Sequence, residues 1–108
     1  MTTDNEREFT IPPAIPNGGI NRTEGYVYLI RVKGSTACKI GASYDIQQRM
    51  KKLQTNKRYT LECIAARYSR DYMQLEMRLQ CHFKPYHLSG DWFALPQEAI
   101  DEFNTVRL

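Results

Sequence analysis

The residues of this chain that could do chemistry form an ionisable set, together with one glycine, at short spacing. They are Tyr26, Tyr28, Lys39, Gly41, Arg49 and Glu76. Arg49 and Glu76 each fall on the apolar side of a segment with helical period, where a charge is costly unless it is paired or handles a charged ligand. The set therefore indicates either a structural ion pair between two helices or a site for a charged substrate.

Two strands joined by a tight turn are predicted to position the first part of this set. Residues 25–33 are β-branched and aromatic without a breaker, and residues 37–41 form a second strand after a Gly-Ser-Thr turn. In this hairpin Lys39 faces away from Cys38 and Ile40. Because side chains alternate along a strand, one face of the first strand carries Tyr26, Tyr28, Ile30 and Val32.

A helix after this hairpin is predicted to carry Arg49. Ser43 can cap it, and the apolar period runs from about residue 44 to residue 54. Arg49 falls on the same side as the apolar stripe, which comprises Ile46, Met50 and Leu53.

The rest of the chain completes an α+β order. A third strand covers residues 60–68, and a helix carrying Glu76 starts at Ser69 or Asp71. The apolar stripe of this helix comprises Tyr72, Leu75, Leu79 and Phe83. A short strand then covers residues 92–95, and a last helix opens at Pro96, a residue well placed in a first helical turn. The resulting order, β-β-α-β-α-(β)-α, predicts a small antiparallel sheet of three main strands flanked by helices.

Two parts of unequal character are predicted. Residues 1–24 read as a flexible tail, because prolines and a glycine pair interrupt them and no period is visible. Ile11, Ile15 and Ile20 are the residues that could dock this tail. Residues 25–108 have the length of one small domain.

Composition narrows the class of protein. Hydrophobic residues make up 42% of the chain and charged residues 25%, which is ordinary for a globular protein in water. No apolar run approaches the roughly 18 residues of a membrane span. The chain has three cysteines and no Cys-x-x-Cys pair, so a disulfide framework is not expected. These features predict a cytoplasmic protein with no membrane partner.

The positive charge is concentrated in the second part of the chain. Residues 1–24 hold four acids and two bases, whereas residues 25–108 hold eight acids and thirteen bases. Five bases fall within ten residues, namely Arg49, Lys51, Lys52, Lys57 and Arg58. Such a cluster can attract nucleic acid, although a solvated helix face followed by a loop would have the same composition.

Taken together, these residues resemble the GIY-YIG nuclease superfamily in its phage-associated branch. Tyr26-Val27-Tyr28 stands where the GIY tripeptide would, and Lys39-Ile40-Gly41 stands where the YIG tripeptide would. Arg49, eight residues after Gly41, matches the family arginine, and Glu76 matches the metal-binding glutamate. The run Gly90-Asp91-Trp92-Phe93 is similar to a signature of this branch. The resemblance covers roughly residues 25–95, and it implies a bacterial or phage-infected cell.

The resemblance implies a metal-dependent DNA endonuclease or nickase. One divalent ion, Mg²⁺ or Mn²⁺, would be held mainly by Glu76, and Arg49 would brace a phosphate oxygen. Tyr28 is the candidate general base, because positive neighbours favour a phenolate. Lys39 would support it or act as the base itself, and Tyr26 would orient water. The residues expected to contact DNA are Gly41, Ser43, Lys51, Lys52, Lys57 and Arg58.

Two departures from the family pattern leave alternatives open. Lys39 replaces the tyrosine of YIG, and Gln80 stands four residues after Glu76, where a histidine is often found. These departures favour a second hypothesis, a nucleic-acid-binding module on the same scaffold with weak or no cleavage. A third class is a protein-interaction domain that uses the tail for docking.

Overall fold

The sheet is built around a central strand that is buried on both faces. In the computed structural model, which describes residues 9–108, β1 (Gly25–Val32) pairs antiparallel with β2 (Ala37–Ser43) and with β3 (Leu61–Ser69). Two short strands, β5 (Trp92–Ala94) and β4 (His87–Ser89), extend the sheet beyond β2 in the order β3-β1-β2-β5-β4. The predicted α+β fold is confirmed, with five antiparallel strands and three helices.

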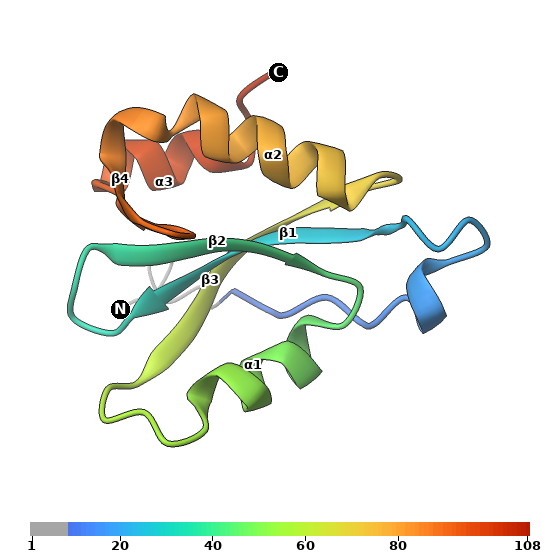
Figure 1. The fold of residues 1–108 in the computed structure, drawn as a ribbon, viewed down its shortest axis with the longest axis horizontal. Coiled ribbons are helices and arrows are strands. Elements are labelled where there is room, and N and C mark those ends of the chain that lie inside the picture. Colours follow the sequence, from blue (N-terminus) through green and yellow to red (C-terminus); the bar gives the residue numbers. More distant parts are fainter. Residues whose placement is uncertain (1–8) are drawn as a thin grey trace, which may run out of the picture.

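The helices cover the two faces of this sheet unequally. Helices α2 (Tyr72–His82) and α3 (Gln97–Phe103) lie over one face, and α1 (Ile46–Gln54) lies under the other, as Figure 1 shows. Short 3-10 turns occur at Pro16–Gly18 and Lys84–Tyr86. None of the helices in the described part of the chain is long and apolar enough to cross a membrane.

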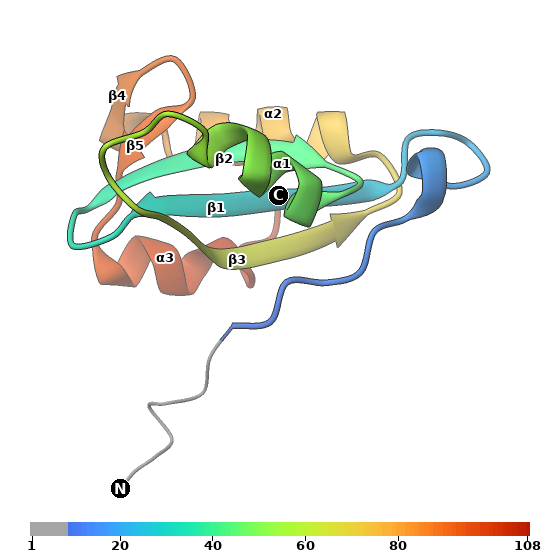
Figure 2. The same ribbon diagram turned by 90° about the horizontal axis from the view of Figure 1, so that it is seen from below.

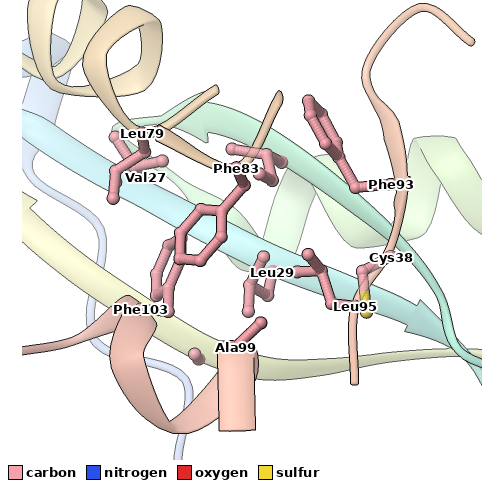
Figure 3. Packing of buried hydrophobic residues seen from close by; sticks show 11 residues of the cluster. Val27, Leu29, Cys38, Leu79, Phe83, Phe93, Leu95, Ala99 and Phe103 are labelled. Atoms are coloured by element: carbon pink, nitrogen blue, oxygen red, sulfur yellow. The ribbon is translucent and has the colours of Figure 1, made fainter. Parts of the chain in front are cut away.

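The larger core lies between the sheet and the pair of helices α2 and α3. Val27 and Leu29 of β1 point into it, opposite Leu79 of α2, and the rings of Phe83 and Phe103 stack with centroids 6.4 Å apart (Figure 3). These side chains are at most 1% exposed. Leu75 of α2 also packs against this core. The apolar stripe predicted for the Glu76 helix therefore faces this core.

A smaller core lies on the α1 face of the sheet. Its buried members are Tyr26, Tyr28, Ile30, Ile46 and Leu61. The predicted sharing of one strand face by the two tyrosines, Ile30 and Val32 is confirmed, and Lys39 lies on this face, away from Cys38 and Ile40. This face is the one that carries most of the candidate site.

Helix starts and the second hairpin differ in detail from the predictions. The N-cap of α1 is Asp45, whose carboxylate accepts a 3.0 Å hydrogen bond from the backbone N–H of Gln48. The hydroxyl of Ser43 instead closes the preceding turn, accepting from the backbone N–H of Asp45 at 2.9 Å. Strand β4 was not predicted, because all three of its residues are exposed and leave no alternating pattern to read.

The segment before β1 contacts the domain at several points. The backbone N–H of Ile15 donates to the carbonyl of Tyr44 at 2.9 Å, and the hydroxyl of Tyr26 donates to the carbonyl of Pro13 at 2.8 Å. Ile11 and Ile15 pack against the smaller core, whereas Ile20 is 95% exposed and docks nothing. The first eight residues of the predicted tail lie outside the described residues.

Candidate active site

The candidate site lies where the outer edge of β2 loses its strand partner. Strand β5 pairs with β2 only from Ala37 to Lys39, so the edge is open from Ile40 onward. The Ile40 carbonyl accepts a 2.8 Å hydrogen bond from the Gln80 amide of α2, and the Ile40 N–H donates to the Asp91 carbonyl at 3.0 Å. These bonds satisfy the backbone N–H and carbonyl of Ile40, which no strand pairs on this side. They also bring α2 and the β4–β5 turn to this edge.

Gly41 and Tyr28 form the centre of the site. They are cross-strand partners in the β1–β2 hairpin. A Cβ added at Gly41 would come within 2.5 Å of Tyr28 Cζ and 2.7 Å of Cε1, and closer still to the hydroxyl oxygen. The absent side chain of Gly41 therefore leaves the space that the Tyr28 ring occupies across the strand.

Replacing this glycine tests that packing. We expect Gly41→Ala to lower the free energy of unfolding by about 1–3 kcal/mol, because the Tyr28 ring is only 1% exposed and cannot move aside freely. Urea denaturation of wild type and variant measures the loss. In a Tyr28→Leu background, where the ring atoms are gone, the same substitution should cost clearly less. An equal cost in both backgrounds would contradict the proposed clash.

Tyr28 is almost completely buried, with only 1% of its surface exposed. Within residues 9–108 its hydroxyl has no hydrogen-bond partner, yet no fully buried side-chain oxygen or nitrogen in that part of the chain is left unpaired. The oxygen therefore keeps a trace of accessible surface. Burial raises the pKa of Tyr28 to about 12; Arg49 opposes this, whereas Glu76, Asp91 and Cys63 add to it. Arg49 thus favours the phenolate, as expected of a positive neighbour, but burial outweighs its effect.

Arg49 and Glu76 approach Tyr28 from opposite faces of the sheet. Both charges act on its hydroxyl, although α1 lies on one face and α2 on the other (Figures 1 and 2). Arg49 is exposed rather than on the buried side of α1, and Glu76 is half-buried. Among the described residues no ion pair joins the two. The alternative of a structural ion pair between packed helices is therefore wrong.

The surroundings of the Glu76 carboxylate disfavour its charged form. Burial and the neighbouring Asp91 raise its pKa, while Lys39 and Arg49 act in the opposite direction. A carboxylate whose charged form is disfavoured by burial and by a nearby acid is stabilised by an added cation.

Asp91 is the residue that sequence reasoning did not assign to the site. Its carboxylate lies 3.4 Å from the Lys39 ammonium and accepts a 3.2 Å hydrogen bond from the Gln80 amide. Lys39 also lies over the Trp92 ring, 5.7 Å from its centroid. The signal in the sequence is the acid of the Gly90-Asp91-Trp92-Phe93 run.

The other predicted site residues lie at varying distances from this centre. The Tyr26 hydroxyl is committed to Pro13 and is not among the groups that act on Glu76. Ser43 follows Gly41 along β2 and bonds to Asp45. The basic residues are all exposed, two on the later turns of α1 and two in the loop after it, namely Lys51, Lys52, Lys57 and Arg58.

The donors at this edge suit one hard divalent cation. Mg²⁺ binds through one or two carboxylates and keeps several waters or phosphate oxygens, and Glu76 and Asp91 supply such carboxylates. Within residues 9–108 no group of three or more His, Cys, Asp or Glu side chains could form an all-protein metal cage. A cation here would therefore be completed by solvent and substrate oxygens.

Comparison with known proteins identifies a domain family. The family model of the T5orf172 domain matches residues 25–106, which is most of the chain. No curated protein and no solved structure matches the chain.

Proposed function

The chain belongs to the T5orf172 domain family, which is related to the GIY-YIG nucleases, and we propose that it is a metal-dependent DNA endonuclease or nickase. One observation carries this proposal. The charges of Arg49 and Glu76 both act on the Tyr28 hydroxyl, yet the two side chains form no ion pair with each other. In this proposal a phosphodiester and a cation bind between the guanidinium and the carboxylate.

Each residue of the site has a role in this proposal. Glu76, with Asp91 beside it, holds a single Mg²⁺ or Mn²⁺. When bound, the ion supplies charge neutralisation at the phosphoryl and leaving oxygens. Arg49 is free to bind a non-bridging phosphate oxygen in bidentate fashion, and the small Gly41 lets the phosphate approach the strand.

Lys39 and Tyr28 take the remaining roles. Lys39 forms an ion pair with Asp91. Its proposed role is therefore that of a positive charge beside the phosphate. Tyr28 is the proposed proton acceptor for the attacking water, and the lack of any other hydrogen-bond partner for its hydroxyl among the described residues supports this assignment. Tyr26, which is bonded to Pro13, contributes by holding the preceding segment against the hairpin.

The exposed bases of the α1 side offer a surface for the DNA backbone. Lys51 and Lys52 lie on α1, and Lys57 and Arg58 lie in the loop after it, so DNA bound along this side would reach the β2 edge. Phosphate contacts of this kind make binding strongly dependent on salt.

The acidity of Tyr28 gives the proposed reaction a characteristic pH dependence. Because its pKa lies near 12, the phenolate fraction rises about tenfold for each pH unit below that value. We expect the single-turnover nicking rate to rise with pH across the neutral range and to show no plateau. In Tyr28→Phe both the rate and this slope should be lost. If the rate of Tyr28→Phe still rises with pH in the same way, a group other than Tyr28 accepts the proton of the attacking water.

A plasmid assay tests the proposal as a whole. Supercoiled DNA incubated with the protein and Mg²⁺ or Mn²⁺ should be converted to nicked or linear form, and EDTA should stop the conversion. The second candidate, a nucleic-acid-binding module that does not cleave, is favoured by the depth at which the Tyr28 ring is buried. Salt-sensitive binding without product in any divalent metal would establish that candidate instead.

A further inference from the structure

A shallow pocket lies on the α1 face of the sheet, beside the candidate active site. Helix α1 covers only the middle of this face, and the loop after it runs toward the β4–β5 hairpin (Figure 2). The residues that line the pocket come from β1, β2, this loop, β4 and β5, namely Val32, Ala37, Tyr59, Leu88, Ser89 and Trp92. We call this site the aromatic pocket.

The walls of the aromatic pocket are apolar and accessible. Tyr59 is 42% exposed and Leu88 is 56% exposed, although both are large apolar side chains. Among the described aromatic residues Tyr59 and Trp92 make no ring–ring contact with each other, although both line the same hollow. Two rings at an open, apolar hollow are suited to a flat ligand.

The charges next to the pocket are mostly positive. Lys33 follows Val32 directly, and Lys57 and Arg58 precede Tyr59. Lys39 lies over the Trp92 ring itself. The one acid adjoining these residues, Asp91, is already paired with Lys39. These charges therefore favour a flat ligand that carries negative charge over a basic or a neutral partner.

Trp92 and Lys39 connect the pocket to the cleavage site. Lys39 contacts Trp92 on one side and Asp91 on the other, and Lys39 and Asp91 both act on Glu76. A nucleotide whose base rests on Trp92 would thus have its phosphate close to the charged groups at the β2 edge.

We propose that the aromatic pocket receives the base of an unpaired nucleotide next to the cleaved phosphate. This inference rests on the proposed function and specifies its substrate class, DNA with a single-stranded stretch such as a flap or gap. Bases inside a continuous duplex are stacked on their neighbours and cannot enter, whereas an unpaired base stacks on an aromatic ring without regard to sequence.

The only tryptophan of the chain provides a direct test. The full chain is titrated at low salt in EDTA with oligothymidine, a blunt duplex and a duplex carrying a single-stranded flap, while Trp92 fluorescence is recorded. We expect the single strand and the flap to quench the emission and the blunt duplex to leave it nearly unchanged. Quenching by none of these DNAs would overturn the proposal and leave the pocket to a protein partner.

Variants of Tyr59 make the test specific. Tyr59→Ala should weaken oligothymidine binding about ten-fold, the usual order for loss of one stacking ring, and Tyr59→Phe should restore it. Tyr86 is the matched control, because it is 36% exposed but packs against Phe83 of the other core. Equal weakening by Tyr86→Ala, or none by Tyr59→Ala, would contradict the assignment. Thermal melts check that each variant is folded.

Cleavage assays with plasmid and with the flap duplex, on the same proteins, separate the two proposals. Cleavage without Trp92 quenching would refute the pocket and leave the nuclease assignment standing. Tyr59-dependent quenching without cleavage of either DNA in Mg²⁺ or Mn²⁺ would support the pocket and refute cleavage.

Discussion

Glu76→Gln is expected to abolish metal-dependent nicking while leaving the fold at least as stable as that of the wild type. Removing the main carboxylate for the proposed cation takes away several kcal/mol of charge stabilisation, so activity should fall about a thousand-fold or more. Plasmid nicking over a range of Mg²⁺ and Mn²⁺ concentrations measures this loss. Nicking that persists in Glu76→Gln would remove Glu76 from the site.

The stability of the same variant distinguishes a functional carboxylate from a structural one. Glu76 has no ion-pair partner among the described residues, so its neutralisation strands no buried cation. Burial and Asp91 already disfavour its charged form. Thermal unfolding without metal should therefore show an unchanged or slightly raised midpoint. A loss of about 3–5 kcal/mol would instead mean that a buried pair had been broken.

Glu62→Gln is the matched control for both measurements. Glu62 does form an ion pair, with Arg31 at 3.0 Å, and it lies on β3 away from the open edge of β2. Because both side chains are partly exposed, breaking this pair should cost less than about 1 kcal/mol. Nicking by this variant should stay at the wild-type level.

Arg49→Ala is expected to lower the nicking rate about a hundred- to a thousand-fold, the usual effect of removing one preorganised donor from a developing charge. The side chain is exposed and unpaired in the described part of the chain, so stability should change by no more than about 0.5 kcal/mol. Single-turnover kinetics and urea denaturation measure the two effects. Arg49→Lys should recover only part of the rate, since an ammonium cannot bind phosphate in bidentate fashion.

Arg78→Ala controls for the loss of one positive charge. Arg78 is also an exposed helical arginine, but α2 carries it and it takes no part in the charges acting on Tyr28. The salt dependence of DNA binding is compared between the two variants directly, whereas the cleavage rate should fall only in Arg49→Ala. An equal fall in the cleavage rates of the two variants would mean that Arg49 contributes only positive charge and has no specific role at the phosphate.

Local patterns in the chain were reliable where one buried face repeats over several turns or pleats. The alternation of Tyr26, Tyr28 and Ile30 placed them on one side of β1, and the period of Leu75 and Leu79 placed α2 on the sheet. The same reasoning was weaker at helix ends, because Ser43 and Asp45 are both good N-caps and only the course of the chain selects between them.

Which chemical groups this protein has available, and on which strand or helix each one stands, was readable from residue types and local period alone. How they meet was not. Period places a side chain on one side of its own element, but it does not reveal that α1 and α2 lie on opposite faces of the sheet (Figure 1). Nor does it reveal that β5 stops pairing at Lys39 and leaves the β2 edge open.

Those long-range arrangements left Arg49 and Glu76 without an ion pair between them and brought Asp91 beside Lys39. They also buried the ring of Tyr28 and so raised its pKa. The pairing of distant segments and the burial that follows from it depend on the whole chain at once, which is why they appear only in the folded domain.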